Sequence, residues 1–495
     1  MTTKNSEVQI KINEGVNLIE KNNFLEAEKI FLPFVDNKET EIIGLFFLGI
    51  ISIKKKENFK AKELFYQILA IDKYHPEANF NLALVYFGEE NFDEALKYFD
   101  VLIKINDKHL PSYYHKGLIY MARDDFDNAI NNFEICDKID DRFIPTSLNL
   151  GNIHLRRNEF KKSIHYYQKI LKTSSDKTYS NLAKFNISWN QLAEGSLDEG
   201  FKNYEVRNEK PLVKKQVNEL IIQYSCKEWQ GENLDNKTIL ILSEQGLGDN
   251  IHFFRYLFWL KDKFNVNIIF YIKKKQSHLF EDTPFKVVSN LDNLTNVHYF
   301  KFIMSLPGLY YKQNQSFPKL VEYIKPNEKN YLIWKDRLQK YKKPIIALNW
   351  QGDRTFMFDK TRSIALSNFK NILSFEEYTF ISLQKGFGSE QIKINKFENH
   401  IVDLSKEIDN GDKTFEDTIS ILKNIECLIT SDTSIAHLAG TLDIKTYLLL
   451  SFNPEWRWFI ENKYNVFYPK IKIIQQKKPG DWQTVFDEVE IILKK

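Results

Sequence analysis

The sequence predicts an N-terminal α-helical solenoid followed by two α/β halves, each built on a mostly parallel sheet. Small residues recur every 34 positions through the first part of the chain. After Thr238, short all-apolar runs alternate with helical patterns, and a second such series begins at Ile345. Strands that alternate with helices favour doubly wound α/β structure. At 495 residues the chain is also too long for one compact core.

The helical prediction rests on three series of residues that share one register. Small residues form the first series, at Ala27, Ala61, Ala95, Ala129 and Ser163. Phenylalanines stand three positions earlier, at Phe24, Phe92, Phe126 and Phe160, whereas Phe59 stands two positions before Ala61. The third series is Gly15, Gly49, Ala83, Gly117 and Gly151. Each unit is therefore predicted to be a helical hairpin in which small residues allow close helix contact, with neighbouring hairpins stacked into a superhelix.

This pattern resembles the tetratricopeptide repeat over roughly residues 8–175. A degenerate sixth unit, Leu197 to Phe201 with Tyr204, is expected to close the array, so we place the solenoid at 8–207. The repeated residues are interpreted as packing positions rather than catalytic ones. The resemblance implies a groove that binds a protein or peptide.

A polar connector is predicted at 208–237, followed by halves at 238–335 and 340–495 with a break around Tyr331–Pro344. The run Ile239–Leu242 is apolar throughout, as expected of a strand buried on both faces. The other expected strands are Asn267–Ile272, Phe285–Val288, Val297–Phe302, Ile345–Leu348, Thr379–Leu383, Ile425–Thr430 and Lys445–Leu450. A helix is expected at Thr414–Lys423, where Thr414 and Asp417 have capping-box spacing.

The first candidate site motif is the turn from Ser243 to Asn250, which contains Gly246, Gly248 and Asp249. It is not a dinucleotide-binding fingerprint, because the position of the third glycine holds Ile251. No Gly-Lys-Ser/Thr follows, so a phosphate-binding P-loop is excluded too. Two interpretations stay open: Asp249 caps the following helix, or it is a general base beside glycines that let a substrate approach the backbone.

The second motif runs from Leu428 to Gly440 and is expected to be a strand, a hydroxyl-rich turn and a helix. Its polar residues are Ser431, Asp432, Thr433, Ser434 and His437. Free N–H groups at the helix start, together with the hydroxyl groups, could bind a diphosphate. Alternatively, Ser431 or Asp432 only caps the helix and His437 is a core histidine.

A third region follows the first strand of the second half and carries Arg354, Lys360 and Arg362. These cations could neutralise a diphosphate, although a charged loop is more often simply solvated. No carboxylate pair is evident for binding a metal, and we expect none.

Taken together and in this order, the three motifs resemble glycosyltransferase family 9, which includes heptosyltransferases and has the GT-B fold of two facing Rossmann-like domains. The likeness is greatest to bacterial proteins that join tetratricopeptide repeats to such a domain, in which segments like Glu244–Asp249, Ser382–Gly386, Phe415–Thr418 and Trp456–Trp458 recur. It implies that Asp249 is the catalytic base, and that Thr433 and His437 hold the donor diphosphate with Arg362 as a cationic stabiliser. Ser434 stands where classical heptosyltransferases have glycine. The resemblance thus implies a metal-independent, inverting transfer from a nucleotide-sugar co-substrate, with no further cofactor.

The amino-acid composition restricts the kinds of partner that are expected. The 69 Lys+Arg nearly balance the 66 Asp+Glu, so no nucleic-acid partner is expected. The three cysteines are widely spaced, and no run approaches the roughly 20 apolar residues of a membrane span. We therefore expect a cytoplasmic glycosyltransferase whose repeats recruit the acceptor or a partner protein. The alternative is a non-catalytic tetratricopeptide scaffold with a vestigial transferase-like domain.

Overall fold

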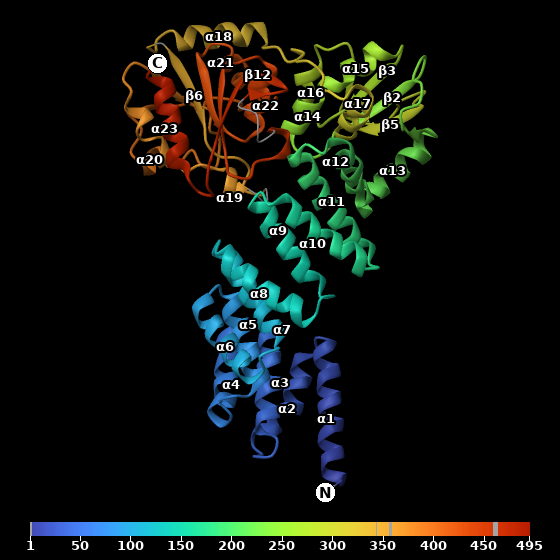
Figure 1. Cartoon of the computed structure of the whole chain (residues 1–495), viewed down its shortest axis with the longest axis vertical. Helices are drawn as coiled ribbons and strands as arrows, with labels where there is room; N and C mark the ends of the chain where they lie inside the picture. The colour runs from blue at the N-terminus through green and yellow to red at the C-terminus, as the bar shows by residue number, and fades with distance from the viewer. Residues whose placement is uncertain (1, 343, 356–358, 459–463) are drawn as a thin grey trace. The chain divides into compact units, whose positions relative to one another are not determined.

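The computed structural model describes residues 2–342, 344–355, 359–458 and 464–495 (Figure 1). The chain divides into two compact units. The helical unit comprises Met1–His154 and His165–Ser175, and the α/β unit comprises Leu155–Ile164 and Asp176–Lys495. The predicted boundaries at 207 and 237 thus both fall inside the α/β unit.

The helical unit is a series of antiparallel hairpins, as the 34-residue period predicts. Its helices are α1 (Thr2–Glu20), α2 (Phe24–Val35), α3 (Glu41–Lys54), α4 (Asn58–Ile71), α5 (Pro76–Gly88), α6 (Phe92–Ile105), α7 (Leu110–Ala122) and α8 (Phe126–Ile139). Helices α9 (Ile144–Arg156) and α10 (Phe160–Thr173) contribute residues to both units.

Each repeat glycine lies against an aromatic ring of the second helix of its own hairpin. A Cβ atom added at Gly117 would stand 2.6 Å from the Phe133 ring, and one at Gly151 would stand 2.6 Å from Tyr167. Gly15 and Gly49 face Phe31 and Phe65 in the same way. The small residue is therefore required by a ring sixteen positions later in the sequence.

The turns within the hairpins repeat with the same period. One residue in each turn has a left-handed backbone conformation with φ between 58° and 63°: Asn22, Lys56, Glu90, Asp124 and Asn158. Only three of the five are Asn or Asp, the non-glycine residues that tolerate this conformation best. The hairpin packing thus imposes the turn geometry even where Lys or Glu occupies it.

The α/β unit begins with further helices. They are α11 (Lys177–Glu194), α12 (Leu197–Tyr204), the 3₁₀ turn η1 (Glu205–Glu209) and α13 (Pro211–Tyr224). The chain leaves α11 through Gly195, whose φ of 89° suits glycine. Helix α12 is the segment predicted to close the repeat array.

The first sheet has five parallel strands in the order β1-β5-β2-β3-β4. They are β1 (Lys227–Glu228), β2 (Thr238–Leu242), β3 (Asn267–Tyr271), β4 (Lys286–Val288) and β5 (Tyr299–Phe302). The intervening helices are α14 (Leu247–Phe253), α15 (Arg255–Lys263), α16 (Lys274–Ser277), η2 (His278–Phe280), η3 (Ile303–Ser305) and α17 (Leu306–Asn314). All five residues of β2 are buried, as the apolar run predicts.

The second sheet has seven strands in the order β11-β12-β10-β9-β6-β7-β8, and only β11 runs antiparallel to its neighbour. They are β6 (Ile345–Asn349), β7 (Thr379–Ser382), β8 (Ile401–Asp403), β9 (Cys427–Ser431), β10 (Thr446–Leu450), β11 (Tyr464–Asn465) and β12 (Tyr468–Gln475). The accompanying helices are α18 (Glu328–Leu338), α19 (Asp359–Arg362), η4 (Leu366–Phe369), η5 (Ile372–Ser374), α20 (Gln391–Ile394), α21 (Glu416–Leu422), α22 (Ser434–Thr441), η6 (Trp456–Trp458) and α23 (Trp482–Leu493).

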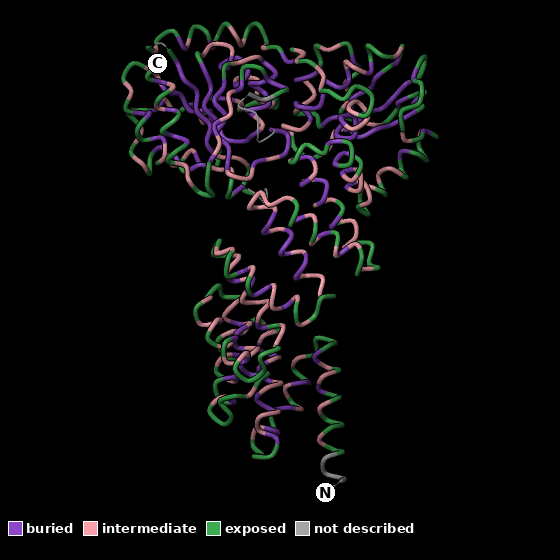
Figure 2. Tube along the Cα trace, in the orientation of Figure 1, coloured by how far each residue is buried: buried purple, intermediate pink, exposed green. Residues whose placement is uncertain are grey.

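One hydrophobic core joins the two sheets. Buried residues follow the strands of both sheets (Figure 2). A single cluster of contacting buried side chains contains Ile241 of β2, Ala347 of β6 and Leu428 of β9. The C-terminal region is therefore one packed unit with two mainly parallel sheets, which is the part of the predicted architecture that the structure supports.

The predicted capping box at Thr414 is wrong. Helix α21 begins at Glu416, preceded by Phe415 with φ of 67° and without a side-chain cap. The Asp417 carboxylate instead accepts hydrogen bonds from Trp334 Nε1 at 2.7 Å and from the Asp409 N–H at 2.6 Å. The spacing of Thr414 and Asp417 fits a local capping box. In the folded chain, however, the Asp417 carboxylate binds the Trp334 indole and the Asp409 backbone instead.

Every helix in the described part of the chain is too short or too polar to cross a membrane.

Candidate functional site

The candidate site lies where the carboxyl end of β2 in the first sheet meets those of β9 and β10 in the second. Helix α14 follows β2 and helix α22 follows β9, and the two helices lie between the sheets (Figure 1). Their N-terminal turns are in close contact. A Cβ atom added at Gly248 would stand 3.0 Å from His437 Cδ2 and 3.2 Å from Ser434 Cα. The structure thus brings the first and second sequence motifs together.

Asp249 has two partners. Its Oδ2 accepts a hydrogen bond from the Gly246 N–H at 2.9 Å, which is the contact expected of a helix cap. Its Oδ1 forms an ion pair with the Arg457 guanidinium from the turn after β10. The carboxylate is 16% exposed. The capping interpretation therefore describes the resting contacts of Asp249, and its role as a base stays a prediction.

Arg457 is the central cation of the site. Its side chain is only 5% exposed and also pairs with Glu455. The guanidinium lies 5.2 Å from the Trp456 ring centroid and 5.6 Å from that of Phe253. Burial opposes its charge, but Asp249 and Glu455 outweigh that effect and raise the pKa of Arg457. Arg457 is therefore always charged, and it connects the two sheets electrostatically.

Two further carboxyl groups lie beside this pair: Asp432 is buried, and Glu455 is partly buried. Burial raises the pKa of Glu455 to about 7, against the lowering effect of Arg457. Burial also raises the pKa of Asp432, which Arg362 opposes. The site thus holds more acidic groups than cations, and Glu455 is partly protonated near neutral pH.

Arg362 lies at the end of the short helix α19. Its Nε donates to Asp359 Oδ1 at 3.2 Å. A Cβ atom at Gly352 would stand 2.5 Å from its Nη2, so the guanidinium covers that glycine. Of the other cations predicted in this loop, Arg354 lies 3.8 Å from the Phe387 ring centroid and Lys360 is exposed. Residues 356–358 of the loop lie outside the described residues.

The hydroxyl groups of the second motif lie at the carboxyl edge of the second sheet. Thr433 is the N-cap residue of α22, and its Oγ1 donates to Asn349 Oδ1 at 3.0 Å. Ser431 ends β9 and is fully buried, and its Oγ has no hydrogen-bond partner among the described residues. Ser434 is the first residue of α22 and touches the Gly248 position. This edge therefore presents a helix start and a buried hydroxyl beside the cations.

His437 lies one turn into α22 and is enclosed by aromatic rings. It stacks on Trp458 with centroids 4.7 Å apart and an interplanar angle of 14°. Its Nδ1 lies 3.3 Å from the Tyr468 hydroxyl, which also meets His252 Nδ1 at 2.8 Å. Burial, then Arg457, lowers the pKa of His437 well below its usual value. The imidazole is therefore neutral, and a neutral histidine can donate a hydrogen bond to a phosphate but brings no charge.

The sequence interpretation gave no role to Arg457 and Glu455. Their signal was an arginine between two tryptophans with a glutamate directly before them, in Glu455–Trp458, five residues after the end of β10. Among the described residues no group of three or more His, Cys, Asp or Glu side chains is arranged to hold a metal ion.

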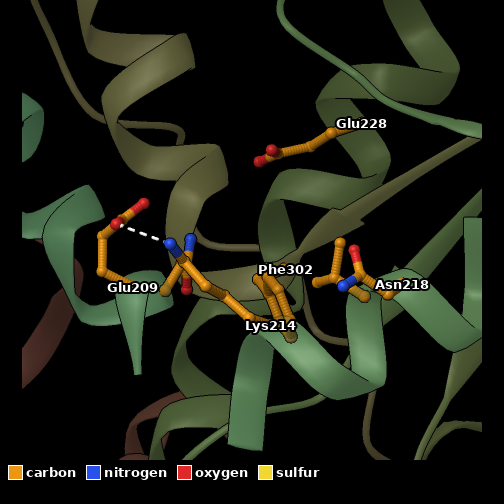
Figure 3. A pocket seen from close by; sticks show the side chains of 7 residues that line it. Glu209, Lys214, Asn218, Glu228 and Phe302 are labelled. Atoms are coloured by element: carbon orange, nitrogen blue, oxygen red, sulfur yellow. Dashed lines mark ion pairs between the residues drawn. The ribbon is translucent and has the colours of Figure 1, made fainter. Parts of the chain in front are cut away.

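A separate cavity of about 430 Å³ lies at the carboxyl ends of β1 and β5 (Figure 3). Its lining residues are Asn208, Glu209, Lys214, Val217, Asn218, Glu228 and Phe302. Lys214 and Glu209 form an ion pair of 2.9 Å at its wall. None of the predicted site residues lines this cavity.

The chain is a helical-repeat protein with a C-terminal unit of two mainly parallel sheets. The tetratricopeptide repeat family matches residues 56–116 and 110–142, so the N-terminal region carries tetratricopeptide repeats. Repeats of this class present surfaces for protein partners.

Similar proteins cover parts of the chain. The curated protein FlbA of Caulobacter vibrioides is 22% identical over 334 residues, which cover 61% of this chain and 53% of FlbA. The chain thus spans about half the length of this distant relative. Among solved structures, MamA from Desulfovibrio magneticus is 16% identical, with 34% of this chain and 94% of that chain covered and a TM-score of 0.31. A tetratricopeptide repeat protein from Parabacteroides merdae is 14% identical, with 44% and 91% covered and a TM-score of 0.34.

Proposed function

We propose that the α/β unit transfers a sugar from a nucleotide-sugar donor to an acceptor hydroxyl group, and that the repeats recruit the acceptor or a partner protein. The observation that carries the proposal is the ion pair between Asp249 and Arg457. It places a carboxylate from the first half and a buried cation from the second half at the carboxyl ends of parallel strands. Ligands of open α/β sheets bind at such ends.

The reaction needs one group for each charge that develops. The acceptor oxygen attacks the anomeric carbon and loses its proton, while the bond from that carbon to the diphosphate oxygen breaks. Asp249 would take the proton as general base. Arg457 and Arg362 would stabilise the charge on the departing nucleoside diphosphate. The group that would act on the acceptor and the groups that would act on the leaving diphosphate thus lie together in the folded chain.

Donor binding would use the carboxyl edge of the second sheet. The free N–H groups at the start of α22 and the Ser431 and Thr433 hydroxyl groups suit a diphosphate. A diphosphate offers the Arg457 guanidinium a second anionic partner, in competition with Asp249. Release of Asp249 from Arg457 would free one carboxylate oxygen for the acceptor proton. The neutral imidazole of His437 could contribute a hydrogen bond.

A non-catalytic scaffold is the second candidate, and one observation favours it. Both carboxylate oxygens of Asp249 have partners within the chain, and the His437 ring is enclosed by Trp458, His252 and Tyr468. Such contacts are also what a packed remnant of a transferase would have. The repeats would then supply the function through their protein partners.

A screen of sugar donors with the purified full-length protein distinguishes the two candidate functions, the transferase and the non-catalytic scaffold. Nucleotide sugars are tested for thermal stabilisation of the wild type, and for release of nucleoside diphosphate with candidate acceptors. We expect at least one donor to stabilise the protein and turn over, and Asp249→Asn to lower turnover at least 100-fold while binding persists. Asp443→Asn, which removes a carboxylate paired with Lys470 away from the site, is the matched control. A wild type that no nucleotide or nucleotide sugar stabilises would favour the scaffold.

A further inference from the structure

We infer that Arg207, in the helical segment before the first sheet, is a positioning residue for the Asp249 loop. The loop runs from Ser243 to Gly246 and leads into α14. Arg207 lies on η1, outside both sheets, and its side chain is 4% exposed. The inference rests on the proposed function in so far as Asp249 is the base.

Arg207 binds the loop through the carboxylate of Glu244. Its Nε donates to Glu244 Oε2 at 3.0 Å and its Nη2 donates to Glu244 Oε1 at 2.8 Å, which is a two-point contact. The same Glu244 oxygen accepts the Met304 N–H at 3.0 Å. The guanidinium also lies 4.7 Å from the Tyr204 ring centroid. Glu244 is thereby fixed in position and orientation five residues before Asp249.

An ionic network with buried cations and partly exposed carboxylates holds Arg207 itself. Its Nη1 donates to Glu205 Oε1 at 2.8 Å, and its Nη2 donates to Ser305 Oγ at 2.7 Å. Lys301 of β5 lies 3.7 Å from Glu205 and 2.7 Å from Glu228. Burial alone would raise the pKa of Glu205, but Arg207 and Lys301 lower it. Glu205 therefore stays charged, and the network links η1 to β5 of the first sheet.

The loop needs such support because its backbone is strained. Gln245 has φ of 56°, in the left-handed region that is strained for a non-glycine residue. Its side-chain amide donates to the Tyr204 hydroxyl at 2.9 Å. On the other side, Asn250 Nδ2 donates to the Gly246 carbonyl at 2.9 Å. Helix α12 and η1 thus hold one side of the loop while α14 holds the other.

The end of η1 borders a cavity. Asn208 and Glu209, the last residues of η1, line the cavity of about 430 Å³ (Figure 3). Arg207 is the residue of η1 that bonds to the loop, while Glu209 at the end of η1 is paired separately with Lys177 and Lys214. Loss of the two-point contact should release the loop without removing any residue of the donor-binding edge.

The test compares Arg207→Lys with Arg337→Lys in the full-length chain. Arg337 is also paired with a glutamate, Glu407, but on the surface of the second half. Lysine keeps the charge and loses the two-point geometry. In Arg207→Lys we expect hydrogen exchange at the Gly246 and Met304 amides to rise at least tenfold. With a donor, kcat should fall at least tenfold while affinity for a nucleoside diphosphate stays within twofold. Arg337→Lys should change none of these.

Hydrogen exchange at these two amides is measured without donor, so it tests the contact between Arg207 and the loop independently of enzymatic activity. Unchanged exchange at Gly246 and Met304 in Arg207→Lys overturns the inference, whatever the donor screen gives. Raised exchange in Arg207→Lys, together with a wild type that turns over no donor, supports the loop contact and contradicts the proposed function. If Arg207→Lys does not fold, Glu244→Gln removes the charge from the other end of the same two-point contact. It should raise exchange at Gly246, and unchanged exchange there again overturns the inference.

Discussion

Replacing Gly248 by alanine tests the contact that brings the two motifs together. The new Cβ would lie 3.0 Å from His437 Cδ2 and 3.2 Å from Ser434 Cα. The second neighbour is backbone, so α14 and α22 must move apart by a few tenths of an ångström. Overpacking of this kind costs about 1–3 kcal/mol, and alanine regains about 0.5–1 kcal/mol over glycine in a helix. We therefore expect Gly248→Ala to lower the free energy of unfolding by about 1 kcal/mol.

Tryptophan fluorescence is a selective assay for this change. All eight tryptophans lie at or beyond Trp189, so they report the α/β unit. The control is Gly246→Ala in the same loop, where the new Cβ meets only the Asp249 carboxylate at 3.2 Å. If Gly248→Ala proved more stable than the wild type in guanidinium unfolding, α14 and α22 would not be in contact and the reasoning would be refuted.

Two further outcomes follow from the packing and the charges. Gly117→Ala, whose Cβ would stand 2.6 Å from Phe133, should destabilise the helical unit by about 1–3 kcal/mol, while Gly88→Ala, with nothing within 4 Å, should be neutral or slightly stabilising. Circular dichroism during urea unfolding measures both, and equal effects would contradict the repeat packing. Because burial raises the pKa of Glu455 from 4.5 to about 7, the folded state binds more protons than the unfolded state between these values, and stability should fall as pH rises from 4.5 to 7. Unfolding monitored by fluorescence at several pH values should give a smaller slope for Glu455→Gln, and an unchanged slope would show that Glu455 does not titrate there.

Most of the fold could be predicted from the sequence because the strongest sequence signals are local. The 34-residue period and the fully apolar strands need no knowledge of distant contacts. Strand β12 was not predicted, since Tyr468–Gln475 contains a proline and two lysines and gives no clean alternation. The turn residues at Lys56 and Glu90 were not predicted either, because their conformation follows from hairpin packing rather than from residue type.

The candidate site could be predicted only in part. The motifs located Asp249, Thr433 and His437, and chain order gave no distance between them. The ion-pair partner of Asp249 is Arg457, which is 208 positions away in the sequence and lies in η6, after β10 of the other sheet. Arg207 illustrates the same limit, because it is the last residue of the predicted solenoid and nothing in the sequence indicates its contact with Glu244, 37 positions away. Pairings of this kind arise from topology, so a single sequence does not contain them.

The most direct test is a calorimetric titration of nucleoside diphosphates, the common leaving groups of sugar donors, into the full-length protein. The wild type should bind at least one of them. Arg457→Met should weaken that binding at least tenfold, because it removes the buried cation beside the carboxyl edge of the second sheet. Arg337→Met, which removes a surface arginine from the same unit, should bind like the wild type. Equal affinity in the wild type and Arg457→Met, or no binding to the wild type, would contradict a diphosphate site at Arg457.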